Sequence, residues 1–113
     1  MVRRKYLPER GDIVWLNFNP QSGHEQKGKR PVIVISPKEY NEKTGLGLFC
    51  PITSKVKNYP FEVKVDSKGI TGVVLSDQIK SLDWKTREIE FIAKESSNKI
   101  DEIIDKISVL FKE

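Results

Sequence analysis

An apolar, β-branched run at residues 31–35 constrains the fold of this chain most strongly. Residues of this kind favour extended backbone, and a strand without a polar side is expected to be covered on both faces. The run follows a polar loop, and Arg30 stands at the junction between the two. A guanidinium fixed beside a rigid strand has a set direction, and its planar fork can bind two phosphate oxygens at once. This junction is therefore a candidate anion site.

Similar patterns predict a chain made mostly of short strands. Runs rich in β-branched and aromatic residues, bounded by turn residues, predict strands at residues 12–18, 46–52, 61–65, 72–76, 77–84 and 87–93, with a turn at 66–72. Many short strands with brief connections indicate a small, strongly bent sheet or barrel.

Two helices are predicted. The short one should begin at Ser36, which can cap it together with Glu39, and should end at Gly45. The second should carry an apolar stripe at helical spacing from Ile100 to Phe111.

Size and composition limit the classes of protein to which the chain can belong. With 113 residues we expect one domain, residues 1–113, and the formal net charge of +4 suits a polyanionic partner but is also ordinary for a soluble protein. A single cysteine, Cys50, and a single histidine, His24, argue against a disulfide, a cysteine cluster or a histidine pair, so we expect no metal and no cofactor. No run is apolar enough for a membrane span or a signal peptide, so a cytoplasmic protein is expected.

Single residues leave alternatives open. His24 has the pKa range of a general base, but a lone loop histidine is more often solvated. Glu25 lies in the same loop, and composition alone favours a surface ion pair for it. Thr53 and Ser54 can offer hydroxyl groups to a phosphate, although such pairs also begin turns. The residues alone thus indicate a small β-rich domain with a basic loop that suits phosphate.

Several motifs together go further. They are Gly11-Asp12, Glu25-Gln26, Gly28-Lys29-Arg30-Pro31, Ser36-Pro37, Pro51-Ile52-Thr53-Ser54, Tyr59-Pro60-Phe61-Glu62-Val63 and Gly72-Val73-Val74-Leu75-Ser76-Asp77-Gln78-Ile79-Lys80-Ser81. In this order and spacing the chain resembles the MazF/PemK toxins, most closely the MazF branch, over essentially its whole length. The resemblance implies a mainly β fold with short helices, a small SH3-like or plug β-barrel with a C-terminal α-helix, assembled as a homodimer.

The resemblance also implies an activity. Members of this family are growth-inhibiting toxins of type II toxin-antitoxin systems that act as sequence-specific, metal-independent endoribonucleases on single-stranded RNA, chiefly mRNA. The 2′-hydroxyl attacks the phosphate and leaves 2′,3′-cyclic phosphate and 5′-hydroxyl ends. A MazE-like antitoxin with an acidic, disordered segment neutralises the toxin, and DNA is contacted only through the antitoxin.

Carried over residue by residue, the resemblance implies a catalytic set of Arg30, Thr53 and Glu25. Arg30 would neutralise charge on the phosphorane and Thr53 would hydrogen-bond a phosphate oxygen, while Glu25 could accept the 2′-hydroxyl proton. The candidates for RNA contacts are Phe18, Asn19, Lys29, Ser54, Lys57, Gln78 and Lys80.

One departure limits the transfer. The PemK branch carries an arginine where this chain has Leu75, so we expect Asp77 to be a buried structural carboxylate rather than a base.

Two other functions remain open at this point. Toxins of the same fold poison DNA gyrase through a Trp-Gly-Ile type C-terminus, which residues 109–113 lack, and a catalytically silent SH3-like binding module is a weaker alternative.

Overall fold

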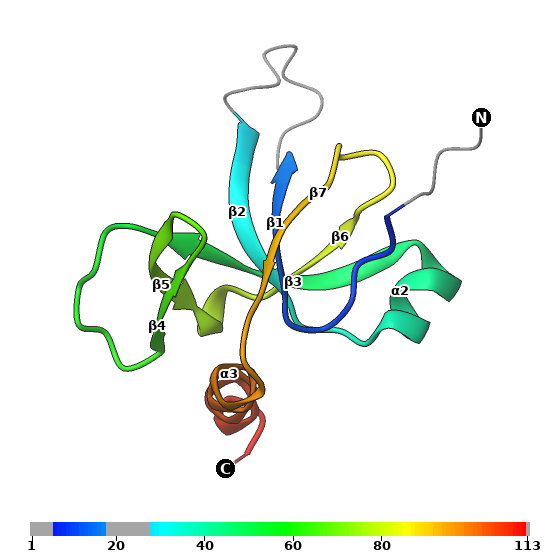
Figure 1. Ribbon diagram of the computed structural model, residues 1–113. Coiled ribbons are helices and arrows are strands. Elements are labelled where there is room, and N and C mark those ends of the chain that lie inside the picture. Colours follow the sequence, from blue (N-terminus) through cyan, green and yellow to red (C-terminus); the bar gives the residue numbers. More distant parts are fainter. Residues whose placement is uncertain (1–5, 18–27, 113) are drawn as a thin grey trace.

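The computed structural model describes residues 6–17 and 28–112, which form a seven-stranded, entirely antiparallel sheet curled into a half-barrel (Figure 1). The strands are β1 (Asp12–Asn17), β2 (Lys29–Val34), β3 (Leu46–Thr53), β4 (Glu62–Ser67), β5 (Ile70–Leu75), β6 (Lys80–Asp83) and β7 (Glu90–Lys94). Helix α2 (Lys38–Thr44) precedes β3, a 3-10 turn η1 (Ser76–Gln78) joins β5 to β6, and α3 (Ser97–Val109) closes the chain. The expected fold, mainly β with short helices and a C-terminal helix, is confirmed.

Strand β3 is the centre of the sheet. The order is β4-β5-β3-β2-β1-β7, and β6 also pairs with β3. Phe49 pairs with Val34 of β2 on one edge of β3 and with Lys80 of β6 on the other. Towards its end β3 exchanges β6 for β5, where Thr53 pairs with Val73. The residues predicted to act at the end of β3 are therefore attached to a strand that pairs with three others, β2, β5 and β6.

Both faces of the sheet are covered, as the run at residues 31–35 predicted. On one face Ile33 packs with Ile103 and Ile107 of α3, which lies below the sheet in Figure 1. On the other face Val32 and Phe49 pack with Trp84 and with partly buried residues of the N-terminal lead-in. Alternate residues of β2 thus belong to two different hydrophobic clusters, and close packing on both faces holds the strand in place.

The helices differ from prediction at their ends. Pro37, not Ser36, is the N-cap of α2, because the Ser36 hydroxyl turns inward to donate to Asn41 Oδ1 and to accept from Leu48 N–H. Gly45 ends the helix in the left-handed conformation with φ of 73°, as predicted. Helix α3 ends at Val109, so the apolar stripe stops early.

The strand boundaries also differ from the prediction. The predicted turn at 66–72 is only Lys68-Gly69, both with positive φ, between β4 and β5. The predicted strand at 77–84 is shortened to β6, because η1 takes up residues 76–78. The predicted strand at 87–93 begins only at Glu90 as β7, after a turn at residues 85–88 in which Glu88 has a φ of 54°. Positive φ at non-glycine residues is uncommon, so the sequence pattern gave no warning.

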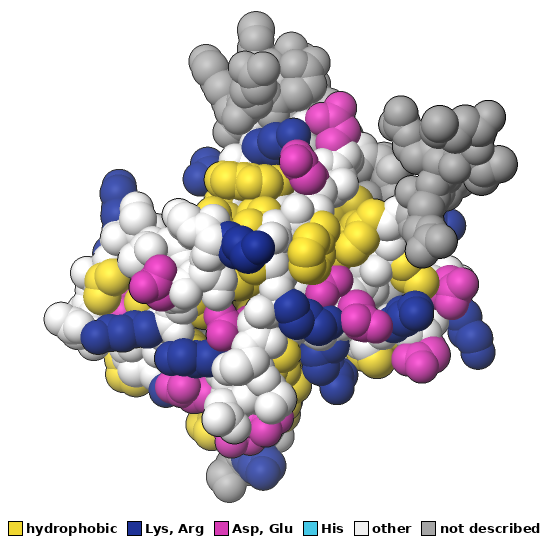
Figure 2. All heavy atoms as spheres, in the orientation of Figure 1, with side chains coloured by type: hydrophobic (Ala, Val, Ile, Leu, Met, Phe, Trp, Pro, Cys, Tyr) yellow, Lys and Arg dark blue, Asp and Glu magenta, His cyan; other side chains and the backbone are white. Residues whose placement is uncertain are grey.

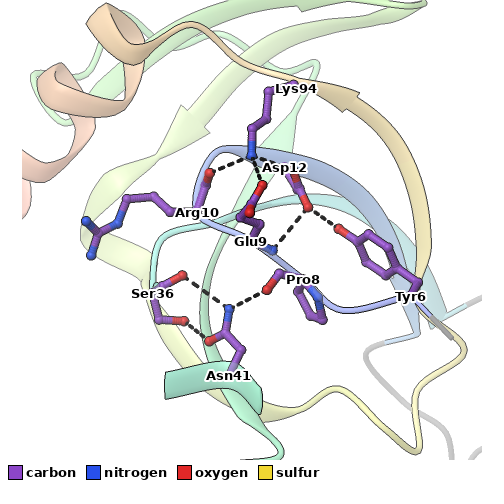
Figure 3. A network of polar contacts seen from close by, with 8 residues as sticks. All are labelled: Tyr6, Pro8, Glu9, Arg10, Asp12, Ser36, Asn41 and Lys94. Carbon is purple, nitrogen blue, oxygen red and sulfur yellow. Dashed lines mark hydrogen bonds and ion pairs between the residues drawn. The ribbon is translucent and has the colours of Figure 1, made fainter. Parts of the chain in front are cut away.

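A polar network fixes the N-terminal lead-in to the sheet (Figure 3). Asp12 Oδ2 accepts from the Tyr6 hydroxyl and from Glu9 N–H at 3.1 Å, and Asp12 Oδ1 accepts from Lys94 at 3.0 Å. Asn41 donates to the Pro8 carbonyl at 2.9 Å. Burial, then the hydrogen bond and charge of Asp12, raise the pKa of Tyr6. The network holds the chain end against β1 and β7.

Within residues 6–17 and 28–112, no helix combines the length and apolar character needed to cross a membrane.

Candidate functional site

A pocket of about 300 Å³ lies where the end of β3, the loop at residues 54–60 and η1 meet. In Figure 1 this loop projects to the left of the sheet between β3 and β4. The described residues that line the pocket are Thr53, Lys55, Lys57, Tyr59, Glu62, Leu75, Asp77 and Gln78. Side chains from two stretches of the chain, residues 53–62 and 75–78, therefore converge at one end of the central strand.

Several hydrogen bonds hold the loop in place. Lys57 N–H donates to Glu62 Oε2 at 3.0 Å, and the Tyr59 hydroxyl donates to Asp77 Oδ2 at 2.7 Å. Lys106 of α3 donates to the carbonyl of Pro60 at 2.7 Å. The first bond ties the loop to β4, the second to η1 and the third to the C-terminal helix.

Thr53 is the final residue of β3 and lines the pocket. Its Oγ1 accepts a hydrogen bond from Lys55 N–H at 3.1 Å. This bond uses one lone pair of the oxygen and leaves the hydroxyl proton to be donated. The geometry is that of a donor suited to an anionic oxygen in the pocket.

Asp77 is half-buried and lines the pocket, whereas we expected a buried structural carboxylate. Its Oδ2 accepts from Tyr59, whereas its Oδ1 is buried and has no hydrogen-bond partner among the described residues. The bond from Tyr59 and the charge of Asp77 raise the pKa of Tyr59. Burial, followed by the Asp77 charge, raises the pKa of the buried Cys50 thiol to about 12.

Arg30 lies on the neighbouring strand. Strand β2 begins at Lys29, before the predicted start, so Arg30 sits within the strand rather than at its junction with the loop. It is exposed and pairs with Leu16 of β1. The residue pairs between β2 and β3 run from Val34–Phe49 to Val32–Pro51, so Arg30 and Thr53 each lie two residues beyond the last pair on their strand. Arg30 is not among the described residues that line the pocket.

The other predicted residues divide into three groups. Lys57 and Gln78 line the pocket with Thr53, and exposed Ser54 follows Thr53 in the chain. Lys29 instead approaches Glu90 at 3.7 Å, and Lys80 pairs with Phe49 in β6. The remaining predicted residues, Glu25, Phe18 and Asn19, lie outside the described residues, as does His24.

Five lining residues were not among the predicted site residues: Lys55, Tyr59, Glu62, Leu75 and Asp77. Lys55 and Tyr59 flank Lys57 in one loop, and Asp77 adjoins Gln78. Their closeness in the sequence to predicted residues is the only signal that could have identified them as site residues. The hydrogen bond between Tyr59 and Asp77 joins residues 18 apart, and nothing in the sequence indicates it.

Charges at the site are mixed. Two lysines and two carboxylates line the pocket. Over the face shown in Figure 2, basic and acidic side chains are likewise interspersed. In the part of the chain that the structure describes, no group of three or more His, Cys, Asp or Glu side chains is placed to hold a metal ion. In the pocket, Thr53, Lys55 and Lys57 can donate hydrogen bonds to an anion. Beside them lies Asp77, whose Oδ1 has no hydrogen-bond partner among the described residues.

Comparison with known proteins agrees with this arrangement. A family model described as PemK-like, MazF-like toxin of type II toxin-antitoxin system matches residues 9–111. The endoribonuclease toxin MazF of Escherichia coli strain K12 is 43% identical over 110 residues, covering 97% of this chain and 98% of that protein. The sequence led us to expect an endoribonuclease, and this near-full-length relative is named as one.

Solved structures agree. The crystal structure of MazF (Form-I) from Deinococcus radiodurans matches with a TM-score of 0.84 and 47% identity, covering 95% of this chain and 98% of that one. A MazE-MazF crystal structure (Form-II) from the same organism matches with a TM-score of 0.84 and 42% identity over 95% of this chain and 97% of that one. The chain therefore belongs to the family of PemK-like, MazF-like toxins of type II toxin-antitoxin systems.

Proposed function

We propose that this chain is a sequence-specific mRNA endonuclease that uses Arg30, Thr53 and Glu25 and needs no metal or cofactor. The observation that carries the proposal is the position of Thr53. Its hydroxyl lines the pocket at the end of the central strand, oriented by Lys55 N–H, and Arg30 lies on β2, the strand that pairs with β3. Family membership supports the choice of RNA as substrate.

The chemistry fits these side chains. The RNA supplies its own nucleophile, so an O2′–P bond forms, the P–O5′ bond breaks, and 2′,3′-cyclic phosphate and 5′-hydroxyl ends result. Arg30 stabilises the charge that develops on the phosphorane, and Thr53 donates to a phosphate oxygen. Glu25 takes the 2′-hydroxyl proton, and water returns a proton to the leaving oxygen. DNA lacks the 2′-hydroxyl and is not cut in this way.

We further propose the partners that go with this activity. A homodimer of the single unit 1–113 binds single-stranded RNA in the cytoplasm, through Lys57 and Gln78 in the pocket and through Phe18, Asn19, Lys29, Ser54 and Lys80 around it. The Deinococcus radiodurans MazE-MazF structure supports a MazE-like antitoxin as partner. An acidic, disordered antitoxin segment would be attracted to the cations of the site and would cover it. DNA would be bound only through that antitoxin.

The test compares two site variants with two matched controls. Arg30→Ala and Thr53→Ala should each lower kcat by roughly 10²–10³-fold, the usual loss when one stabilising donor is removed. Lys43→Ala in α2 and Thr71→Ala in β5, both exposed, should cleave like the wild type. Cut sites are mapped on a long RNA and the new ends analysed. Wild-type rates in both site variants would remove the mechanism.

Metal removal is tested in the same assay. Cleavage should be unchanged in EDTA, and activity that is lost and then restored by divalent ions would contradict the proposal. Gyrase poisoning is not favoured, because the near-full-length relative is named an endoribonuclease. A supercoiling assay with the purified protein checks that alternative directly.

A further inference from the structure

The chain passes very close to β5 where β3 ends. Thr53 pairs with Val73, and the loop at residues 54–60 then leaves the sheet over Gly72. A β-carbon at Gly72 would lie 2.1 Å from the carbonyl oxygen of Thr53, 2.8 Å from its carbonyl carbon and 3.1 Å from Cα of Ser54. All three are backbone atoms, which cannot rotate away as the tip of a flexible side chain can. Any other residue at position 72 must push the backbone of Thr53 away from β5.

Space, and not backbone conformation, requires glycine at this position. Gly72 is buried in the interior of β5, and it is not among the described glycines with positive φ. Glycine weakens a strand interior, where it packs no side chain, and there it often marks a close approach of another backbone. The approach at Gly72 involves the very residue whose hydroxyl lines the pocket.

We infer that Gly72 is a positioning residue for Thr53, an inference that rests on the proposed function. Its bare α-carbon lets the Thr53 carbonyl settle against β5. The turn that follows then brings Lys55 N–H to within 3.1 Å of Thr53 Oγ1. Gly72 thus fixes the backbone that carries the hydroxyl, and Lys55 N–H fixes the hydroxyl itself. Neither contact involves the substrate.

The expected effect of filling this space is large for so small a change. Relieving a contact of 2.1 Å to an ordinary 3.4 Å needs a shift of more than 1 Å, shared between β5 and the end of β3. A misplacement of about 1 Å can cost on the order of 10²-fold in rate. Gly72→Ala should therefore lower kcat by about 10²-fold. KM should change little, because the side chains that contact RNA remain.

Gly47→Ala is the matched control. Gly47 is also a buried strand glycine without positive φ, but its added β-carbon would meet the ring of Phe49 at 2.9 Å, at the far end of β3 from Thr53. Both variants are compared by circular dichroism and then assayed well below their melting temperatures, with an RNA oligonucleotide that spans a mapped cut site. Gly47→Ala should melt at a lower temperature yet retain the wild-type kcat.

A double variant separates positioning from general damage. If Gly72 acts through Thr53, then adding Gly72→Ala to Thr53→Ala should cause no further loss, because the hydroxyl to be positioned is gone. An equal factor in both backgrounds would overturn the inference, as would a folded Gly72→Ala with the wild-type kcat. Full activity of Thr53→Ala would instead overturn the proposed site itself.

A second pair keeps the inference testable if Gly72→Ala does not fold. Lys55→Pro removes the side-chain charge and the N–H that orients Thr53, whereas Lys55→Ala removes the charge alone. Residue 55 is exposed in the loop, so neither change disturbs the core. Lys55→Pro should have a clearly lower kcat than Lys55→Ala. Equal kcat in the two would mean that Thr53 needs no support from its turn, and the inference would fail.

Discussion

Two aspartates of this protein each accept a hydrogen bond from a tyrosine hydroxyl, but they differ in burial and in their other hydrogen-bond partners. Asp12 is 4% exposed, and its two oxygens together accept from Tyr6, Glu9 N–H and Lys94. Asp77 accepts from Tyr59 alone, and its Oδ1 is buried without a partner in the described part of the chain. Both oxygens of the Asp12 carboxylate are hydrogen-bonded within the fold, whereas only one oxygen of the Asp77 carboxylate is.

The difference separates a region of the molecule that contributes to stability from one that is available for function. A buried polar atom without a hydrogen bond costs free energy, and native folds keep few of them. The Asp12 network lies among β1, β7 and the N-terminal lead-in (Figure 3), and none of its residues is in the described lining of the pocket. Asp77 and Tyr59 line the pocket itself. A buried polar atom without a partner in a native fold calls for an explanation, and a functional role is one such explanation.

The same substitution at both positions gives the largest expected contrast. Asp12→Asn places an amide among three hydrogen-bond donors and should lower the free energy of unfolding by about 2–3 kcal/mol. Asp77→Asn keeps an acceptor for Tyr59 and should change it by less than about 0.5 kcal/mol. Urea denaturation measures both. Similar losses in the two variants would abolish the distinction.

Removing the tyrosine hydroxyls should give a smaller contrast. Tyr6→Phe takes a donor from the buried Asp12 carboxylate and should cost about 1.5 kcal/mol in urea denaturation. Tyr59 is 47% exposed, so Tyr59→Phe should leave the unfolding curve almost unchanged. It frees the loop from η1, however, and should raise KM for RNA several-fold. An unchanged KM would show that the bond between Tyr59 and Asp77 has no part in substrate binding.

The smallest effect concerns acid. The hydrogen bond from Lys94, and then its charge, lower the pKa of Glu9 from its ordinary 4.5. A lowered pKa in the folded state means that the ion pair stabilises the fold above pH 4.5 and that this contribution is lost as pH falls through the folded-state pKa. Glu9→Gln should therefore be slightly less stable than wild type at pH 7, with a gap that closes in acid. A gap that widens in acid would reverse the assignment.

The sequence predicted regular elements better than the places where they break. β-branched runs identified the strands, and the isoleucine spacing identified α3, because both patterns follow from burying one or two faces. The turn at Lys68-Gly69 and the interruption at η1 depend on local φ angles and on pairing with distant strands, which one sequence does not reveal. The turn accompanies the pairing of β4 with β5, and the interruption at η1 precedes the pairing of β6 with β3.

The candidate site divides in the same way. Motif resemblance named Arg30 and Thr53 one by one, and the structure adds that they lie on two paired strands, β2 and β3. The sequence alone could not identify Tyr59 as the partner of Asp77, nor Gly72 as the residue in close contact with the Thr53 backbone. Both contacts arise only when segments distant in the chain come together in the fold.

The central place of β3 has a consequence for amide exchange with solvent. Its backbone is hydrogen-bonded to β2 on one edge and to β6 and β5 on the other, so its amides are expected to exchange chiefly through global opening. The loop that begins at Ser54 is exposed along residues 54–60, where local fluctuations suffice. Deuterium uptake should therefore change abruptly between Thr53 and Ser54. The candidate hydroxyl would belong to the slowest-exchanging strand of the molecule while facing one of its fastest-exchanging segments.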